Sequence, residues 1–570
     1  MGGAMSLVSQ GPRVLNVALE VTLWLAAPII ILLALAGFGA WTVRSARGGI
    51  ALASAAASGA LLVIASVALA NIFLPIPRGL APVAITVGLV AFAISARRLA
   101  FDRCLAQRMI PWAVTAALLY RVGRPRLAYD VFLYHGGILE WIAREPTPQG
   151  LGLLHTRFAF NPGLVLLMAP FRSDGTDWNH HALVESALVV LAFLVLAAVL
   201  NQARGRGDST LAGYVLALAT LTGLFTMLRD VRVGTDLAAG LTVLAACAVA
   251  ASIARTAPSR DRPAVSAEFG LLGLLVVLAV VQKTSAAPAV VLLLAPVVGA
   301  LPQHRRPMLR LLLPALAVSL IAGVAMAVRT WIMSGCLSYP VSLTCIDAPW
   351  AVGREQAARE SAVILSWARG RSMEHTALTD LSWLGSGYGS LITSVGFTLA
   401  AAAVVIGMVV RYDRNHGEGG DSTALPGLLW VHAGLSIMFW VVSAPDRRFG
   451  FAGLLALGAL VLAPALMGRS GVRGTRRTQE RLLHSIPAVA LVTVVAVTAL
   501  EGRYFPFEGS VAHDFEVGRL LDRSGDGLQW HYFHPVGDDR CGDRFPCAPS
   551  ERDLVVELAR ARLIFSRPLG

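Results

Sequence analysis

The sequence RPRLAYDVFLYHGGILEWIAREPTPQGLGLLHTRFAFN, residues 124–161, is the polar segment around which the rest of this chain is arranged. It concentrates carboxylates, histidines, arginines and aromatic side chains, whereas the sequence on either side is apolar enough to lie in a bilayer. Ionisable groups are costly at membrane depth and usually serve a function there. We therefore expect chemistry on a membrane-borne substrate at this segment.

Composition predicts an integral membrane protein. The 570 residues are 56% hydrophobic and 15% charged, with a mean hydropathy of +0.65. Soluble domains average about 45–50% apolar and about 25% charged residues. The net charge of +13 does not indicate nucleic-acid binding, because the arginines form short clusters between apolar spans. We expect no cleavable signal peptide, since the first apolar run is too long and no small-residue cleavage site follows it.

The apolar runs predict an all-α polytopic protein of about 14 transmembrane helices, since a crossing helix needs about 17–25 apolar residues. The expected spans are 15–43, 50–76, 79–96, 109–121, 181–201, 211–228, 236–254, 267–282, 285–301, 311–328, 390–410, 423–443, 449–467 and 484–500.

Basic residues in the short connections predict the orientation, because Lys and Arg accumulate on the cytoplasmic side. A single frame puts seven basic connections inside: Arg44/Arg47, Arg97/Arg98/Arg103/Arg108, Arg204/Arg206, Arg255/Arg260/Arg262, Arg305/Arg306/Arg310, Arg411/Arg414 and residues 469–481. We therefore expect a multi-pass protein of the bacterial inner (cytoplasmic) membrane whose active face is extracytoplasmic. The predicted organisation is N-terminal helices 1–121, an outer loop 122–180, helices 181–328, a second outer loop 329–389, helices 390–500 and an outer tail 501–570.

The cysteines support this frame. Cys336, Cys345, Cys541 and Cys547 all fall outside, where disulfides form, and their spacing suggests the pairs Cys336–Cys345 and Cys541–Cys547. Unpaired thiols are the alternative. Neither pair has the spacing or neighbouring ligands of a zinc site.

Four cations at the predicted outer ends of the spans suit a lipid phosphate. Guanidinium groups offer planar, bidentate donors to phosphate oxygens. Lys283, Arg329, Arg447 and Arg448 form this donor-phosphate set. Lys283 has a simpler alternative, in which its long side chain only reaches the interface, and Arg447 and Arg448 have the alternative of interfacial anchors.

Asp130 is the candidate general base, because a carboxylate within hydrogen-bond reach can take the proton of an acceptor hydroxyl. His135 and Asp236 are the other candidate catalytic residues. Each has a structural alternative: Asp130 and Asp236 suit helix N-caps, and His135 suits a hydrogen-bonded interior position. The remaining candidates, for an acceptor or loop site, are Tyr134, Glu140, His155, Arg157 and Asn161.

No cofactor is expected. The chain has no Gly-x4-Gly-Lys-Ser/Thr loop and no Gly-x-Gly-x-x-Gly motif after a strand, which argues against an ATP-driven pump. An activated sugar would then arrive on a lipid. No tight histidine and carboxylate spacing supports a metal site, although a divalent metal stays an open alternative.

Several ordered motifs resemble a family of uncharacterised bacterial polytopic membrane proteins. They are Tyr129-Asp130 with Tyr134-His135, Gly150-Leu151 to Leu154-His155, Arg157 to Asn161, Thr235-Asp236, Lys283-Thr284-Ser285, Arg329 to Ser334-Gly335, Tyr339-Pro340, Ala348-Pro349-Trp350, Phe439-Trp440 to Gly450, and Cys541 with Pro546-Cys547. That family resembles the GT-C superfamily of glycosyltransferases, which use polyprenyl-phosphate sugars and place a catalytic aspartate in the first large extracytoplasmic loop. Asp130 matches this location, although three additional spans precede it here.

The resemblance implies transfer of a sugar from a polyprenyl-phosphate donor to a cell-envelope glycan acceptor, with membrane lipid and the lipid-linked sugar as partners and no nucleic acid. Two rival functions remain open. An envelope glycan polymerase or ligase would need the arginines but not Asp130. A flippase or transporter would use Lys283 and His432 to line a pathway and would form no bond.

Overall fold

The computed structural model describes residues 11–43, 46–101, 103–122, 126–127, 129–172, 179–228, 232–255, 262–295, 305–369 and 425–466, and four strands between 515 and 566. Most of this chain is helical. The helices are α1 (Gly11–Gly39), α2 (Gly48–Phe73), α3 (Ala81–Ser95), α4 (Arg103–Val122), α5 (Gly136–Arg144), α6 (Leu151–Leu154), α7 (Gly163–Met168), α8 (Asn179–Gly205), α9 (Ser209–Leu228), α10 (Asp236–Arg255), α11 (Arg262–Gln282), α13 (Arg305–Ser334), α14 (Arg354–Ala368), α16 (Gly427–Ser443) and α17 (Arg447–Leu466). Short 3-10 or π segments are η1 (Ala40–Thr42), η2 (Val131–His135), η3 (Thr156–Phe160), η4 (Ala169–Phe171), η5 (Thr284–Leu294) and η6 (Ser342–Thr344).

The described helices make this a membrane protein by length and composition. Six contain stretches long and apolar enough to cross a bilayer, in α1, α2, α8, α9, α10 and α13. Five further apolar helices are shorter, namely Ala81–Ser95, Ser266–Gln282, Thr284–Leu294, Gly427–Ser443 and Arg448–Ala463. Two of the predicted spans, 390–410 and 484–500, lie outside the described residues.

Small residues let the helices of the bundle pack closely. In α2, a Cβ atom on Gly59 would lie 1.8 Å from the Leu35 carbonyl oxygen of α1, so only glycine fits there. Gly39 of α1 meets the Ala55 carbonyl of α2 in the same way. Close backbone approach through small residues is the usual basis of helix packing in membranes, where lipid tails remove the hydrophobic driving force.

The polar connections gather at the two ends of the bundle. Arg206 pairs with Glu268 at 2.8 Å, and Arg255 pairs with Asp208 at 2.8 Å. Helix α10 runs for 20 residues between Asp236 and Arg255, which places these ion pairs about 30 Å from Asp236. Two of the basic connections that the sequence groups together therefore share one end of the bundle.

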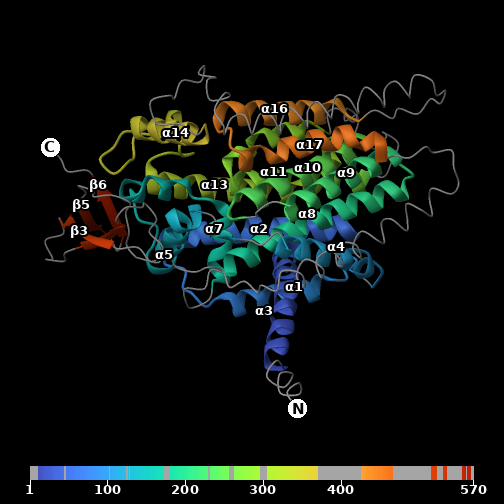
Figure 1. Ribbon diagram of the computed structural model, residues 1–570, viewed down its shortest axis with the longest axis horizontal. Coiled ribbons are helices and arrows are strands. Elements are labelled where there is room, and N and C mark those ends of the chain that lie inside the picture. The colour runs from blue at the N-terminus through green and yellow to red at the C-terminus, as the bar shows by residue number, and fades with distance from the viewer. Residues whose placement is uncertain are drawn as a thin grey trace, which may run out of the picture.

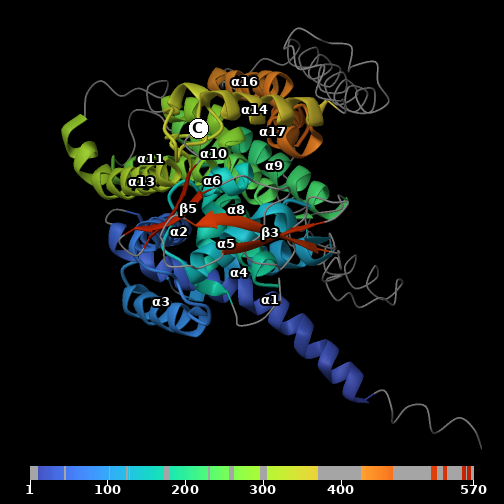
Figure 2. The same ribbon diagram turned by 90° about the vertical axis from the view of Figure 1, so that its left-hand side faces the viewer.

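The other end, which we call the loop end, carries residues 129–172 and 335–369 (Figure 1). Here the predicted Cys336–Cys345 disulfide is present and closes a short loop after α13. The predicted Cys541–Cys547 pair lies outside the described residues. Figure 2, turned to face this end, shows α14 on one side of it and α5 nearer the centre.

The C-terminal segment contains a small sheet that the sequence, interpreted as a polar tail, did not reveal. Its strands are β3 (Phe515–Asp522), β4 (Trp530–Pro535), β5 (Val555–Ala559) and β6 (Arg562–Ser566), in the order β4-β3-β5-β6. Strand β6 joins the first loop, because Gln149 exchanges backbone hydrogen bonds of 2.9 Å with Leu563 and Phe565. The Phe565 ring also packs edge-on against Trp141. The end of the chain therefore braces the segment that carries Asp130.

Candidate functional site

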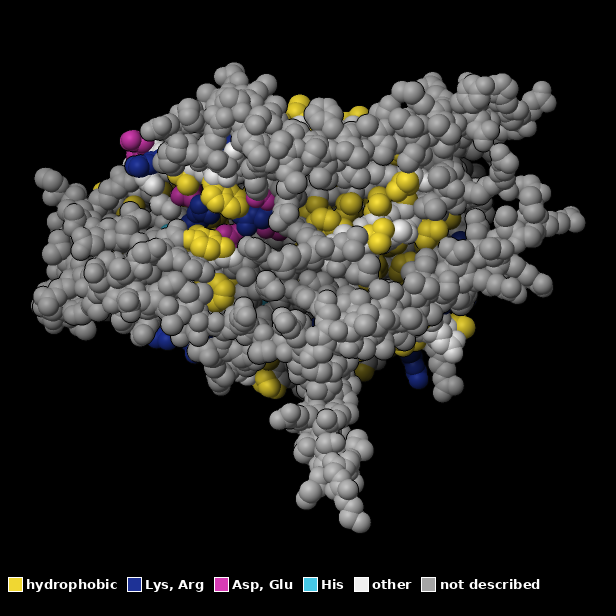
Figure 3. Space-filling view, viewed as in Figure 1, with side chains coloured by type: hydrophobic (Ala, Val, Ile, Leu, Met, Phe, Trp, Pro, Cys, Tyr) yellow, Lys and Arg dark blue, Asp and Glu magenta, His cyan; other side chains and the backbone are white. Residues whose placement is uncertain are grey.

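A cavity of about 1000 Å³ opens at the loop end, between the first loop, the α11–η5 junction, α14 and the start of α17. Its wall contains five predicted site residues: Asp130, Tyr134, Arg157, Lys283 and Arg448. In Figure 3 charged side chains of both signs lie beside hydrophobic ones in a recess below α14. The cavity is large enough for a ligand of substantial size, since small-molecule sites usually measure about 300–1,000 Å³.

A two-residue pairing brings the two candidate aspartates together. Strand β1 (Arg126–Leu127) pairs in parallel with β2 (Arg232–Val233), so that Leu127 lies opposite Val233. Asp130 follows Leu127 by three residues, and Asp236 follows Val233 by three. Equal offsets from paired positions explain why both carboxylates reach the same cation, even though they lie on segments far apart in the sequence.

That cation is Arg448, at the start of α17. Its Nη1 donates to Asp130 Oδ2 at 3.2 Å and lies 4.0 Å from Asp236 Oδ2. Its Nε lies 3.7 Å from Asp446 Oδ1, and its backbone N–H donates to the same oxygen at 2.8 Å. The guanidinium is also 4.5 Å from the Trp367 ring and 4.8 Å from the Phe449 ring. Carboxylates and aromatic faces together fix the orientation of this side chain.

Asp130 is ionised in this setting. Burial raises the pKa of its carboxyl, but neighbouring positively charged groups, with Arg448 the largest contributor, hold the pKa below its usual value. Asp130 stands at the N-cap position of the π segment η2, where its side chain makes no capping hydrogen bond. The carboxylate therefore points to the cavity and to Arg448 instead of satisfying the helix end, which answers the N-cap alternative.

Lys283 lies between α11 and η5, where its backbone is extended. Its Nζ pairs with Asp236 Oδ1 and lies 4.2 Å from the centre of the Phe449 ring. Asp236 therefore forms an ion pair with Lys283 and also lies close to Arg448. Lys283 and Arg448 both line the cavity. Burial lowers the pKa of Lys283 to about 7, so Arg448 is the permanent cation of the two and Lys283 is positively charged below that pH.

Another part of the cavity wall is aromatic and is held in place by the second loop. Arg157 pairs with Glu360 of α14 at 2.7 Å, and Thr156 donates to the same carboxylate at 3.0 Å. Tyr134 packs beside Phe160 with ring centres 5.8 Å apart, and Phe160 packs edge-on against Tyr339. The ion pair between Arg157 and Glu360 joins η3 to α14 and holds the two loops over the cavity.

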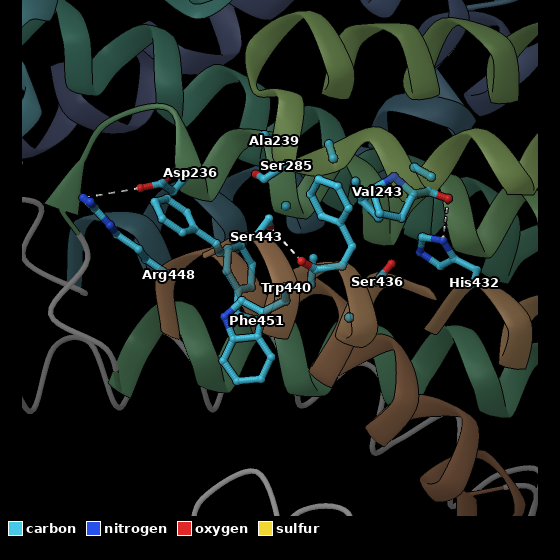
Figure 4. A pocket seen from close by; sticks show the side chains of 18 residues that line it. Asp236, Ala239, Val243, Ser285, His432, Ser436, Trp440, Ser443, Arg448 and Phe451 are labelled. Carbon is cyan, nitrogen blue, oxygen red and sulfur yellow. Dashed lines mark hydrogen bonds and ion pairs between the residues drawn. The ribbon is translucent and has the colours of Figure 1, made fainter. Parts of the chain in front are cut away.

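A narrow crevice adjoins the cavity between α10, η5 and α16 (Figure 4). Arg448 and Asp236 stand at one end of it, and His432 stands at the other with Nδ1 3.3 Å from the Pro288 carbonyl oxygen. Its volume is about 30 Å³, enough for about two water molecules. His432 is therefore a buried residue whose ring is hydrogen-bonded.

The two loop histidines lie beside the cavity and not in its wall. His135 is buried against the Tyr134 ring, and burial lowers its pKa to about 4, so the imidazole is neutral. His155 is buried beside Phe158, and its Nδ1 accepts the Arg157 backbone N–H at 3.4 Å, which caps η3. His155 is therefore a hydrogen-bonded interior residue. His135 is buried, but its Nε2 has no hydrogen-bond partner among the described residues, and it follows directly after Tyr134, whose side chain lines the cavity.

Arg329 and Asn161, predicted for phosphate and acceptor contacts, bind each other. Arg329 is buried and donates to Asn161 Oδ1 and, at 3.3 Å, to Asn71 Oδ1. Asn161 adopts a left-handed conformation with φ of 48° and donates to Thr330 Oγ1 at 3.1 Å. Asparagine tolerates this conformation better than most residues. The pair fixes the turn before α7 to α13 and α2.

Glu140 lies in a separate cluster, where it accepts hydrogen bonds from Arg78, Arg144 and Arg172. The Arg447 side chain, Cys541 and Cys547 lie outside the described residues. Among the described residues, no group of three or more His, Cys, Asp or Glu side chains is arranged to hold a metal ion.

Four residues of the site were not among the predicted ones. Asp446, Trp367 and Phe449 contact Arg448, and Glu360 contacts Arg157. Asp446 and Phe449 flank the predicted arginines, which was a usable signal. Glu360 and Trp367 are seven residues apart on α14, a spacing that puts them on one helix face, but the sequence did not indicate that α14 would cover the cavity.

Comparison with known proteins finds one family. A family model described as a domain of unknown function, DUF8201, matches residues 22–455. No curated protein and no solved structure matches the chain. The matched range includes Asp130, Asp236, Lys283 and Arg448.

Proposed function

The chain belongs to the DUF8201 family, whose description assigns no activity, and from its cavity we propose an integral membrane glycosyltransferase. It moves a sugar from a polyprenyl-phosphate donor to a cell-envelope acceptor. The proposal includes a GT-C-like bundle of about 14 transmembrane helices, in the bacterial inner membrane, with the loop end on the extracytoplasmic side.

The observation that carries the proposal is the meeting of Asp130 with two cations in one large cavity at the end of apolar helices. A lipid-linked donor needs a cation for its phosphate and apolar surroundings for its chain. Lys283 and Arg448 supply the first. Val280, Val281 and Ile364 are among the apolar residues that supply the second.

The proposed reaction uses these residues in the following way. Asp130 takes the proton of the acceptor hydroxyl while that oxygen forms a bond to the sugar's anomeric carbon. The bond from the anomeric carbon to the phosphate oxygen breaks, and the electron pair leaves with the polyprenyl phosphate. Arg448 and Lys283 stabilise the charge that develops on this leaving group.

Arg448 serves both partners because a guanidinium has five N–H donors. Its Nη1 contacts the Asp130 carboxylate, and the other N–H donors of the same planar group remain to bind a phosphate. Donor binding would then place the leaving group and the base on opposite sides of a single side chain. The aromatic wall of Tyr134, Phe160 and Tyr339 suits the apolar face of a sugar ring.

The experiment compares envelope glycans and polyprenyl-linked sugars by mass spectrometry in cells with and without the protein. Loss of one sugar residue from a glycan, with accumulation of its lipid-linked form, supports transfer and identifies the donor. Cells lacking the protein are then complemented with wild type, Asp130→Asn or Asp347→Asn. Asp347 is the matched control because it is an exposed loop-end carboxylate whose oxygen accepts the Arg354 N–H, a role that an amide oxygen retains.

Asp130→Asn should reduce transfer by about 10²–10⁴-fold, the usual contribution of a general base, with normal insertion. Asp347→Asn should restore wild-type glycans. Full activity of Asp130→Asn would rule out this base, and loss of activity only in Arg448 variants would favour a polymerase or ligase. An unchanged glycan profile with a displaced lipid or solute would favour transport.

A further inference from the structure

Three arginines surround one carboxylate on the side of the loop end that faces away from α14. Arg78 and Arg172 donate to Glu140, and Arg144 Nε donates to it at 3.1 Å. Three positive charges thus meet one negative charge. This cluster is separate from the cavity wall and plays no part in the proposed reaction.

Only part of the Arg172 guanidinium is hydrogen-bonded. Its side chain is 7% exposed, and only Nη2 reaches Glu140. Its Nε and Nη1 are buried and have no hydrogen-bond partner among the described residues. Buried donors without partners are costly, and guanidinium N–H groups are strong donors to phosphate oxygens. The cluster therefore has unused buried donors and an excess of positive charge, both of which an anionic ligand would satisfy.

The other two arginines form the mouth of this site. Arg144 is half exposed, and the Arg78 side chain is 29% exposed. Arg78 lies in the connection between α2 and α3, and the Gly79 N–H donates to the Arg172 carbonyl at 3.1 Å, which holds this connection against the site. An anion approaching from solvent or from the membrane boundary would meet Arg78 and Arg144 first.

The surroundings are those of a lipid headgroup. Helix α2 contains a candidate membrane span that ends at Phe73, and α3 is an apolar helix that begins at Ala81. Phe73 and Val83, on either side of the connection, are 74% and 60% exposed. Exposed apolar side chains directly beside a basic cluster are expected where acyl chains give way to phosphates.

We propose that Arg78, Arg144 and Arg172 bind the phosphate of an anionic phospholipid headgroup, with Glu140 holding the three guanidiniums in place. The acyl chains would lie along the exposed surface of α3, where Val87, Val90 and Ile94 also face outward. This inference is independent of the proposed sugar transfer, because the two sites share no residue.

The test is native mass spectrometry of the full-length protein in detergent, titrated separately with phosphatidylglycerol, phosphatidylcholine and inorganic phosphate. The variants are Arg144→Gln, Arg172→Gln and the control Arg359→Gln. Arg359 is an exposed arginine of α14 at the same end of the molecule. Arg144→Gln is the decisive variant because its half-exposed side chain can be changed without disturbing the interior, whereas Arg172→Gln risks misfolding.

Wild type and Arg359→Gln should retain one phosphatidylglycerol that Arg144→Gln binds about tenfold more weakly, the loss expected for a charge-assisted contact. Inorganic phosphate at equal concentration should not displace it. Equal retention by Arg144→Gln and wild type overturns the site. Displacement by inorganic phosphate, or equally tight binding of phosphatidylcholine, overturns the assignment to an anionic headgroup.

Discussion

The Arg329 guanidinium joins Asn161 to Asn71, with Nη2 at 3.3 Å from Asn71 Oδ1, and so connects α13 to a turn and a helix that precede it by more than a hundred residues. Arg329 is 1% exposed. A side chain buried in this way serves folding and is not placed to hold a donor.

Arg329→Met should therefore destabilise the protein and spare donor binding. Removing the guanidinium leaves Asn161 Oδ1 without this donor, at a cost of about 1–3 kcal/mol. Thermal unfolding in detergent measures the loss, and titration of the folded fraction with a polyprenyl-phosphate sugar measures affinity. If Arg329→Met had normal stability but no longer bound the donor, Arg329 would be a phosphate-binding residue and the prediction would be wrong.

Arg448→Gln should move the acidic limb of the activity profile to higher pH. Burial raises the pKa of Asp130, and Arg448 is the largest of the charges that lower it. Without Arg448 the pKa rises, so the carboxylate is protonated, and inactive as a base, at a higher pH than in wild type. The transfer rate in proteoliposomes, measured against pH for this variant and Arg359→Gln, checks the shift. An acidic limb at the same pH as in wild type would show that Arg448 does not lower the pKa of Asp130.

His135 should make the protein less stable as the pH falls below about 6.5. Its folded-state pKa of about 4 lies below the ordinary 6.5, so between these values the unfolded chain binds a proton that the folded one excludes. Stability is complete above 6.5 and decreases toward pH 4, with a slope approaching about 1.4 kcal/mol per pH unit. His135→Gln should flatten this part of the melting-temperature profile. An equally steep profile in the variant would assign the effect to other groups.

Cysteine labelling should establish which way the bundle faces. Cys104 is exposed and free, whereas Cys336 and Cys345 form a disulfide. In the proposed orientation Cys104 is cytoplasmic, so a membrane-impermeant maleimide should label it in inside-out vesicles and not in spheroplasts. Cys104→Ser is the control that identifies the labelled thiol. Labelling of Cys104 in spheroplasts would invert the orientation.

The sequence predicted which residues lie at the same end of the bundle. It did not predict where around the bundle axis each of them lies. Hydropathy and charge place Asp130, Lys283 and Arg448 at the same depth, and the structure brings these residues to one cavity. The same reasoning grouped Glu140 and Arg329 with them. Glu140 and Arg329 lie away from the cavity because helix packing sets the direction in which each side chain points. The sequence of an apolar span does not indicate that direction.

Two other features were beyond sequence reasoning for definable reasons. The pairing of β1 with β2 involves two residues on each strand, too short for any alternation to show, yet it sets Asp130 beside Asp236. The position of α14 over the cavity depends on the contact between Glu360 and Arg157, which are distant in sequence. Such long-range pairs become visible only when the bundle is assembled.

The distance between Asp130 and Arg448 along the chain has a consequence for biosynthesis. The two residues are separated by 318 positions. At about 5–20 residues per second, the aspartate leaves the ribosome roughly 15–60 s before its partner arginine. Until α17 is inserted, the nascent loop carries a carboxylate that has to stay hydrated. A chain that ends before Arg448 therefore contains Lys283 as the partner of Asp236 but lacks the ion-pair partner of Asp130.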